Sequence, residues 1–438
     1  MKKNKIIYVG LTLDFYHHGI ANIINNASKY GDILIGLLTD KAISQHKKLP
    51  LFNYAQREKI CYSLNKVYKV VPQDEWDYSV NISKYKPDLF IHGSDWNHDE
   101  SLKNVRNNVV EALNSYGGKL IEIEYTDDIS SSSIRNSFLR NYSQKDYKNN
   151  IFERLLDSNK IIRVIESHSP LSALIAENVA FKSKDIYKTF DCLWSSSLTD
   201  STLNSMPDIE VLDISRRLVN VKNMSNTTNK PIIYDADTGG QLEHFKINIG
   251  LMANSDISAI IVEDKKGLKK NSLLGTDVFQ QQEDIDIFSQ KIFEGKNTLK
   301  NINSSMKIFA RIESFILGKD INDAIARANA YVKAGADGIM IHSRNEDPLE
   351  ICQFAKKFRK LFPDVPLISV PTSYNSIHED ELHAMGFNIV IYANHMLRAS
   401  YKHMEQVAHN ILKHGRTFEI ESDLLSIKEI LKLIPGTD

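Results

Sequence analysis

A regular alternation of short apolar runs and helical stretches constrains the fold of this chain more than any other sequence feature. In the first part, apolar runs at 6–10, 32–39, 67–71, 88–92 and 119–125 alternate with helical spacing at 18–29, 57–64 and 105–115. Continuous apolar strands separated by helices form a parallel sheet that is covered on both faces. We therefore predict an α/β fold that begins with a doubly wound, Rossmann-like domain over residues 1–142.

The second part repeats the strand-then-helix order at greater length. Seven candidate strands lie at 191–194, 231–234, 259–262, 308–310, 338–341, 367–370 and 389–392, and an early strand near 178–181 would complete a set of eight. Helical stretches such as 322–333 and 349–361 lie between them. Such a series closes most simply into a (β/α)8 barrel of the TIM type. We expect this barrel domain to span residues 151–438.

A polar segment at 141–150, nearly free of aliphatic side chains, separates the two parts. It is interpreted either as a linker or as a polar helix that bridges the domains and continues into residues 151–156. Two domains also agree with the length of 438 residues, because a single core rarely grows beyond about 250–300 residues.

The overall composition excludes several classes of function. The 54 basic and 55 acidic residues leave a net charge of −1, which favours neither nucleic acid nor an anionic membrane as a partner. No apolar run approaches the length of about 18 residues that a membrane span needs. The cysteines Cys61, Cys192 and Cys352 are odd in number and far apart, so they form no disulfide framework. We expect buried free thiols in a cytoplasmic enzyme that acts on a small molecule.

Polar side chains follow almost every predicted strand of the second part. In barrels of this kind, functional groups lie just past the carboxyl ends of the strands. The residues at these positions are Trp194, Ser195, Ser196, Ser197, Asp235, Asp237, Glu263, Asp264, Arg311, Glu313, His342, Ser343, Thr372, Asn394 and His395. This end of the barrel is therefore the predicted active site.

Three of these residues supply hard oxygen ligands. Asp235, Asp237 and Glu263 would repel one another unless a cation joined them, and Mg²⁺, which retains some of its waters, fits such a set best. A helix-capping or ion-pair role is the alternative for Asp237. An ion pair is the alternative for Asp264, which precedes Lys265 and Lys266.

Arg311 and His342 are candidates for binding an anionic substrate. Arg311 ends an apolar strand, where its guanidinium needs either a substrate oxyanion or an acid such as Glu313. His342 would donate a hydrogen bond to a developing oxyanion, or else be a satisfied core residue. The segment 263–273 (EDKKGLKKNSL) carries four lysines and predicts a lid over a phosphorylated substrate, with a solvated basic loop as the alternative.

Several motifs together resemble the phosphoenolpyruvate mutase family of the isocitrate lyase superfamily, over about residues 152–412. They are WSSSL at 194–198, PD at 207–208, DADTG at 235–239, the lid at 263–273, ARIE at 310–313 and ANHMLRAS at 393–400. The resemblance implies conversion of phosphoenolpyruvate to 3-phosphonopyruvate with Mg²⁺. The lid contains no cysteine, unlike that of the C–C lyases, and Asn271 distinguishes it from the phosphonopyruvate hydrolases. Hydrolysis and C–C cleavage remain the alternatives.

The resemblance also implies a role for each matching residue. Asp235 would bind Mg²⁺ directly, and Asp237, Glu263 and Asp208 would hold its waters. Trp194, Ser196, Ser197 and Leu198 would bracket the pyruvate part of the substrate. Arg311 and His342 would steady the enolate and the phosphoryl group, while Lys269, Asn271, Ser272 and Leu273 would close the lid. The family exchanges a helix between subunits, which implies a homodimer or a homotetramer.

The first domain resembles cytidylyltransferases of the HxGH class. The motif is His17-His18-Gly19-Ile20, in which isoleucine replaces the second histidine, and AQRE at 55–58, HGSDW at 92–96 and ISSSSIR at 129–135 accompany it. The resemblance implies CTP as a substrate. It also implies a nucleotide site formed by His17, Gly19, Arg57, Asp95, Ser130, Ser131 and Ser132. Isoleucine cannot hydrogen-bond a phosphate, so a non-catalytic nucleotide-binding or structural module is the alternative.

Overall fold

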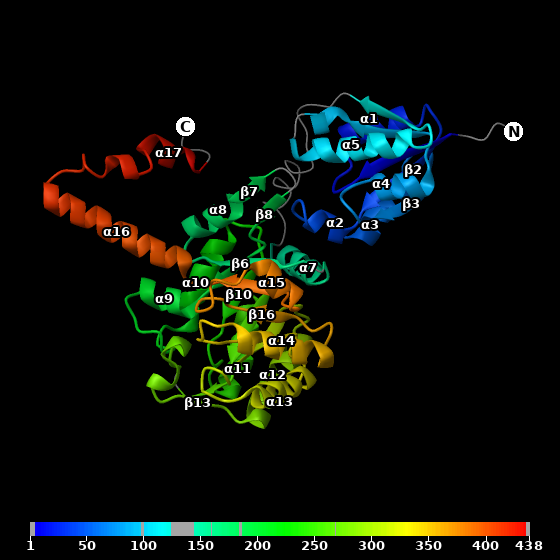
Figure 1. Ribbon diagram of the computed structural model, residues 1–438. Coiled ribbons are helices and arrows are strands. Elements are labelled where there is room, and N and C mark those ends of the chain that lie inside the picture. The colour runs from blue at the N-terminus through cyan, green and yellow to red at the C-terminus, as the bar shows by residue number, and fades with distance from the viewer. Residues whose placement is uncertain are drawn as a thin grey trace.

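A computed structural model describes residues 5–97, 100–123, 144–158, 160–183, 186–267 and 269–434. It contains a five-stranded sheet of order β3-β2-β1-β4-β5 and a closed barrel of eight strands. Figure 1 shows the sheet with its helices in blue and cyan and the barrel in green to orange. All strand pairs in both assemblies are parallel, which confirms the predicted fold class.

The first domain buries both faces of its sheet. Its strands are β1 (Ile6–Leu11), β2 (Asp32–Leu38), β3 (Val67–Gln73), β4 (Leu89–Gly93) and β5 (Lys119–Ile123). Its helices are α1 (His18–Ala27), α2 (Asp40–Ser44), α3 (Tyr54–Tyr62), α4 (Ser79–Tyr85) and α5 (Glu100–Asn114). Ile7 and Ile33 belong to one apolar cluster, whereas their neighbours Tyr8 and Leu34 belong to another. Successive strand residues therefore point to opposite faces, and each face packs against helices.

The barrel strands follow one another in sequence order around the ring. They are β6 (Ile162–Glu166), β9 (Cys192–Ser195), β10 (Ile232–Asp235), β11 (Ala259–Glu263), β14 (Lys307–Ile312), β15 (Gly338–Ile341), β16 (Leu367–Ser369) and β17 (Ile389–Tyr392). The helices are α8 (Pro170–Asn178), α9 (Ser197–Leu203), α10 (Ile214–Ser225), α11 (Leu242–Ala253), α12 (Ile285–Asn301), α13 (Ile321–Lys333), α14 (Leu349–Leu361), α15 (Glu379–Ala384) and α16 (His395–His414). Pairing of β17 with β6 closes the barrel.

The prediction of a barrel strand near 178–181 is wrong. Residues of this segment belong to β7 (Ala180–Ser183), which pairs with β8 (Ile186–Thr189) in a separate antiparallel hairpin. All four residues of β7 are exposed, so its apolar side chains contact no core. The first barrel strand is β6 instead. Its apolar run is interrupted by Arg163, which hides it from a search for continuous apolar residues.

The described part of the polar segment, residues 144–150, is helical and continues into residues 151–156, as the second interpretation predicted. Helix α7 runs from Gln144 to Leu156. Its side chains Tyr147, Ile151, Phe152 and Leu155 share one apolar cluster with Leu38, Ala42, Ile43 and Leu49 of the first domain and with the inward side chains of the barrel strands. Helix α7 and the segment around α2 therefore cover the end of the barrel opposite to the carboxyl ends of its strands.

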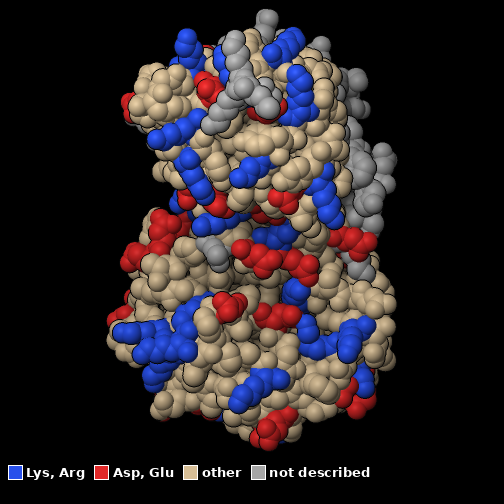
Figure 2. Space-filling view, turned by 90° about the vertical axis from the view of Figure 1, so that its right-hand side faces the viewer, with Lys and Arg blue, Asp and Glu red and all other residues tan. Residues whose placement is uncertain are grey.

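Charged contacts accompany this apolar interface. The guanidinium of Arg154 on α7 donates to Asp40 at 2.6 Å and to the carbonyl of Pro50 at 2.5 Å. Lys48 and Glu177 form an ion pair of 2.6 Å between the first domain and α8. Figure 2 shows acidic and basic side chains side by side along the junction of the two domains.

Helix α16 extends away from the barrel (Figure 1). Leu397 is its only buried residue, and apolar side chains such as Met404 and Leu412 are exposed. The short helix α17 (Ile427–Lys432) has no buried residue. Within the described part of the chain, no helix is long and apolar enough to cross a membrane. The three cysteines are free thiols, as predicted.

Candidate active site

The barrel fold brings most of the predicted site residues to the carboxyl ends of its strands. A cavity of about 70 Å³ opens there. Its lining residues are Trp194, Ser196, Leu198, Asp208, Asp235, Lys269, Asn271, Ser272, Leu273, Arg311, Met340, His342, Val370, Thr372, Ala393 and Asn394. Such a volume is small, at roughly two water molecules of liquid volume.

Lys269 lies inside a cluster of aspartates at this mouth. Its ammonium is 3.1 Å from Asp208 and 3.9 Å from Asp235, and it also contacts Asp237 and the hydroxyl of Ser197. Ser197 donates its hydroxyl to Asp235 at 2.8 Å. Burial would raise the pKa of Asp235, but Lys269, Arg311 and Arg217 hold it near 2. This carboxylate is therefore ionised and close to a positive charge.

Arg217 orients two aspartates, Asp200 and Asp237, and it was not predicted from the sequence. It donates to Asp237 at 3.1 Å and to Asp200 at 3.0 Å, and its guanidinium lies 4.2 Å from the ring centroid of Tyr234. It comes from the buried face of α10, not from a strand end, so the search along strand ends did not include it. Asp237 itself has a positive φ of 52°, in a turn whose backbone N–H donates to the carboxylate of Asp235 at 3.3 Å.

Glu263 is buried, and among the residues that the structure describes neither of its carboxylate oxygens has a hydrogen-bond partner. The nearest basic groups are Arg311 at 3.5 Å and Lys265 at 3.8 Å, and burial raises the pKa of Glu263 to about 7. A buried carboxylate of this kind needs a cation or bound water.

These residues fit a hydrated divalent cation. The described residues contain no three acidic, histidine or cysteine side chains already arranged as metal ligands. The ammonium of Lys269 instead lies between Asp208, Asp235 and Asp237. A cluster that accommodates one cation, next to the unpaired oxygens of Glu263, matches Mg²⁺, which uses few direct protein ligands and keeps several waters.

Arg311 forms the centre of a second network, which begins on strand β14 next to Glu263. It donates to Glu313 at 2.5 Å, to the hydroxyl of Ser272 at 2.6 Å and to Nδ1 of His342 at 2.9 Å. Nδ1 of His342 also lies 3.3 Å from Glu313, but its shorter contact is with Arg311, which can only donate, so we assign the proton of the imidazole to Nε2. Burial and the nearby Arg311 lower the pKa of His342, which keeps the imidazole neutral. Arg311 and Glu313 therefore form an ion pair in this structure, which was the alternative that the sequence left open for Arg311.

Asp264 has the alternative ion-pair role, but with a partner that the sequence did not indicate. It is buried, binds Arg327 at 3.2 Å and accepts from the hydroxyl of Tyr331 at 2.8 Å. Lys265, its neighbour in sequence, pairs with Glu313 at 3.2 Å instead. Asp264 thus fixes the first residues of the lid and does not face the mouth.

The predicted lid has a firm base and lies over the mouth. Strands β12 (Lys265–Lys266) and β13 (Gln281–Gln282) pair at its base, and the 3-10 helix η2 (Ser272–Asp277) follows the tip. Asn271 donates its amide to Asp208 at 3.0 Å and accepts from the backbone of Leu273 at 3.0 Å. Ser272 is buried between Arg311 and Glu313. The lid therefore contributes Lys269, Asn271 and Ser272 directly to the site.

The first domain brings together only part of its predicted nucleotide site. His17 caps α1 without a side-chain hydrogen bond to the helix, and Gly19 follows in the first turn. Ile20 is 8% exposed and belongs to the core. Arg57 is fully buried and donates to the carbonyls of Thr12, Leu38 and Phe52 and to Asp40. The side chain of Asp95 and the whole of Ser130, Ser131 and Ser132 lie outside the described residues.

Comparisons with known proteins match two parts of the chain to two different families. Residues 152–412 match the phosphoenolpyruvate phosphomutase family, and residues 7–137 match the cytidylyltransferase-like family. Similar proteins include a phosphoenolpyruvate phosphomutase of Tetrahymena pyriformis (30% identity; 67% of this chain and 94% of the relative). Another is a phosphonopyruvate hydrolase of Variovorax sp. strain Pal2 (33% identity; 65% and 94%).

Solved structures give the same result. The phosphoenolpyruvate phosphomutase of Streptomyces platensis subsp. rosaceus is 30% identical with a TM-score of 0.60, over 65% of this chain and 94% of that chain. A phosphonopyruvate hydrolase in complex with oxalate and Mg²⁺ is 31% identical with a TM-score of 0.57, over 65% and 94%. The family match covers more than half of the 438 residues. The chain belongs to the phosphoenolpyruvate phosphomutase family and carries a cytidylyltransferase-like domain at its N-terminal end.

Proposed function

We propose that the barrel domain interconverts phosphoenolpyruvate and 3-phosphonopyruvate. The observation that carries this proposal is the position of the lid, which brings Lys269 and Asn271 onto the acid cluster and leaves a cavity of only about 70 Å³. A phosphoryl group that moves from the enol oxygen to carbon C3 passes through a loose transition state and must be kept from water. A closed lid over a small cavity meets that requirement.

The basic groups of the mouth would hold the two charged ends of the substrate. Arg311 is rigidly oriented by Glu313, and its guanidinium would bind a phosphoryl or carboxylate oxygen. His342, neutral with its proton on Nε2, would donate to the enolate oxygen without protonating it. Lys269 would neutralise the migrating phosphoryl group. Trp194, Ser196, Ser197 and Leu198 would bracket the pyruvate part at the opposite wall.

The acid cluster would hold Mg²⁺ through Asp235, with Asp237, Glu263 and Asp208 binding its waters. When bound, this ion would neutralise the anionic oxygens of the substrate. Arg217 fixes Asp237, and Ser197 fixes Asp235. These contacts orient the acids before any ligand arrives. Lys269 would have to leave its present place among them, which links occupancy of the cluster to movement of the lid.

Asn271 favours rearrangement over hydrolysis. Its amide donates to Asp208 at 3.0 Å, and an amide can hydrogen-bond a phosphoryl oxygen but cannot serve as a general base for water. The second candidate function is hydrolysis of phosphonopyruvate, because a relative with that name is 33% identical to this chain. The two candidates use the same barrel and differ in the acceptor of the phosphoryl group.

Phosphorus NMR distinguishes these candidates in one sample. The purified protein is mixed with Mg²⁺ and phosphonopyruvate, and the ³¹P spectrum is followed over time. A phosphoenolpyruvate resonance that disappears with EDTA supports the mutase. Inorganic phosphate accompanied by pyruvate supports the hydrolase and contradicts the proposal.

We infer that the first domain does not transfer nucleotidyl groups. Ile20 is part of the core at the position where the motif has its second histidine, and Arg57 already donates four hydrogen bonds, to three carbonyls and Asp40. Its segment around α2 packs on α7 and the end of the barrel. A docking module, with at most passive nucleotide binding, accounts for these contacts.

The exposed apolar side chains of α16 support a homodimer or homotetramer in which this helix packs on another subunit. Light scattering coupled to size exclusion would measure the mass. A monomer of 49.9 kDa would contradict the oligomer.

The domain limits proposed are residues 1–142 and 151–438, with α7 as the bridge.

A further inference from the structure

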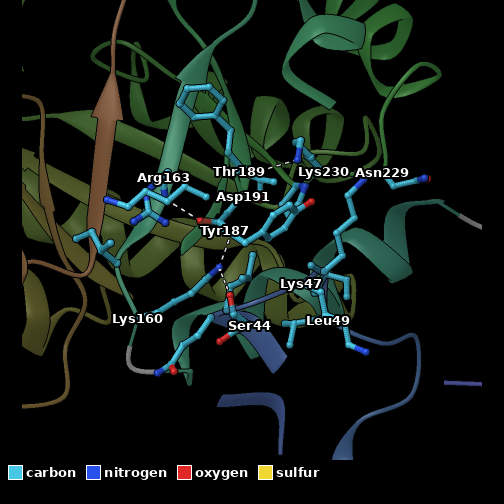
Figure 3. A pocket seen from close by; sticks show the side chains of 18 of the residues that line it. Ser44, Lys47, Leu49, Lys160, Arg163, Tyr187, Thr189, Asp191, Asn229 and Lys230 are labelled. Carbon is cyan, nitrogen blue, oxygen red and sulfur yellow. Dashed lines mark hydrogen bonds and ion pairs between the residues drawn. The ribbon is translucent and has the colours of Figure 1, made fainter. Parts of the chain in front are cut away.

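A second cavity, of about 260 Å³, lies between the two domains at the end of the barrel opposite to the mouth (Figure 3). One wall is the segment 44–49 of the first domain. The other walls are α7, hairpin strand β8 and the residues that precede barrel strands β6, β9 and β10. It shares no lining residue with the mouth. This interdomain cavity is therefore a separate space to which both domains contribute.

The interdomain cavity has an excess of positive charge. Six basic side chains line it: Lys47, Lys48, Lys160, Arg163, Lys188 and Lys230. Glu177 and Asp191 are the acidic lining residues, and Glu379 binds Arg163 and Lys188 from behind, at 2.8 and 2.7 Å. Among the described residues, the basic groups thus outnumber the acids around the cavity. An anion would balance this charge.

Lys230 has the greatest need of a further partner. It is 6% exposed, and within the described part of the chain its ammonium donates one hydrogen bond, to the carbonyl of Phe190 at 2.5 Å. An ammonium has three N–H groups, and burial lowers the pKa of Lys230. Lys160 is different, because it joins the carbonyl of Ser44 at 2.9 Å to Asp191 at 2.6 Å (Figure 3). Lys160 ties the walls together, whereas Lys230 can still receive an oxygen ligand.

The rest of the lining is apolar and partly aromatic. Tyr187 and Phe190 lie beside Ile186, Leu155 and Leu49. Such side chains gain little from a bare inorganic ion, but they would pack against a ring or a short carbon chain. The cavity therefore combines an anion-binding side with an apolar side.

We propose that the interdomain cavity binds a phosphate monoester whose carbon part is a ring or a short apolar group. A phosphate monoester carries a charge of roughly −1.5 to −2 at pH 7, which would offset most of the excess, and lysines bind phosphate as point charges. The phosphate lies toward Lys230 and Lys47, and the carbon part lies against Tyr187 and Phe190. Because Lys47 and Lys230 come from different domains, the ligand strengthens their docking.

Calorimetric titration of the full chain with phenyl phosphate tests this proposal. EDTA is present, so that an anion is not recruited to the mouth by Mg²⁺. We expect saturable binding of one equivalent. Inorganic phosphate, which lacks the ring, binds about tenfold more weakly, and neutral phenol does not saturate. Absence of saturable binding by phenyl phosphate would overturn the proposal.

Paired charge reversals locate the bound molecule. Lys47→Glu with Lys48→Glu changes two exposed residues at the cavity and weakens binding by at least about tenfold. The matched control, Lys356→Glu with Lys357→Glu on exposed positions of α14, leaves the affinity within about twofold. Equal weakening in both pairs would mean non-specific attraction and contradict the site. So would unchanged binding in both, which would place the ligand elsewhere.

Lys230→Met supplies a test of the buried wall. Far-UV circular dichroism and the melting temperature establish that the variant is folded, and its affinity for phenyl phosphate is expected to fall at least about tenfold. A folded Lys230→Met variant with unchanged affinity would exclude the proposed phosphate position. The mutase assay is not part of this test, so the outcome is independent of the reaction in the barrel.

Discussion

Buried arginines lie near the carboxyl ends of both parallel sheets, and their partners differ. Arg57 in the first domain donates mainly to the backbone carbonyls of Thr12, Leu38 and Phe52, which are part of the fold itself. Arg311 in the barrel donates to side chains, and one of these, Ser272, belongs to the lid. Both guanidiniums are protected from water, and that of Arg311 lines the cavity at the mouth of the barrel.

This difference separates a structural charge from a functional one. A guanidinium held by carbonyls already has strong partners, and a ligand would gain little by replacing those bonds. A guanidinium held by Ser272 and His342 can exchange them for substrate oxygens when the lid opens. The same contrast applies to the acids. Asp40 is shared by Arg57 and Arg154, whereas Glu263 has no hydrogen bond within the described part of the chain.

The largest expected effect belongs to the acid cluster. Asp235→Ala removes the proposed direct ligand of Mg²⁺ and should lower the mutase rate by at least about 10³-fold, with the fold retained. Steady-state kinetics at saturating Mg²⁺ measures this loss, and Asp364→Ala, at an exposed position, is the control. A rate within tenfold of the wild type would show that the cluster is not the site of chemistry.

Arg57→Met, in contrast to Asp235→Ala, should lower the stability of the fold. It removes the donor of three carbonyls and one of the two arginines that bind Asp40, so the free energy of unfolding should fall by about 3 kcal/mol. Urea denaturation measures this, and Arg416→Met, at an exposed ion pair, should change it little. Unchanged stability together with lost CTP binding would contradict the structural role of Arg57.

Lys148 at the domain interface extends the comparison to a buried cation held by one serine. Its ammonium donates to the carbonyl and hydroxyl of Ser225, at 2.9 and 2.6 Å, and burial lowers its pKa to about 8. Above pH 8 the unfolded chain holds the proton that the folded chain releases, so stability from this group rises with pH. Between pH 7.5 and 9.5, the wild type should gain about 2 kcal/mol relative to Lys148→Met. Parallel pH profiles of the two proteins would refute this.

Ile20→His should have the smallest effect. It restores the motif histidine in sequence but places an imidazole in a core position, which should cost about 1–2 kcal/mol of unfolding free energy. No pyrophosphate should be released from CTP with a phosphonate alcohol as acceptor. Pyrophosphate release by the variant, or by the wild type, would show that the first domain catalyses nucleotidyl transfer.

The sequence predicts this fold well because most strands are buried on both faces and therefore consist of continuous apolar residues. Strands β15 and β17 have the predicted limits for this reason. Strand β6 was missed because Arg163 interrupts it, and the partner that makes this charge tolerable, Glu379, lies 216 residues away in sequence. Pairing over such a distance leaves no local pattern.

The same reasoning explains which parts of the candidate site could be predicted. Asp235, Glu263 and Arg311 follow strands, so the barrel topology alone brings them to one end. Arg217 comes from a helix, and the partner of Asp264 proved to be Arg327 and not the adjacent lysines. Asn271 was predicted to lie in a lid, but its bond to Asp208 depends on how the lid folds back. Side chains of this kind are placed by tertiary contacts.

One ³¹P NMR experiment tests the central contrast between the two domains most directly. The wild-type protein is incubated with Mg²⁺, phosphonopyruvate, CTP and a phosphonate alcohol in a single tube. We predict that phosphoenolpyruvate accumulates while the CTP resonances stay unchanged. Release of pyrophosphate with phosphonopyruvate left intact would contradict the account, because it would place the chemistry in the first domain and not at the mouth of the barrel.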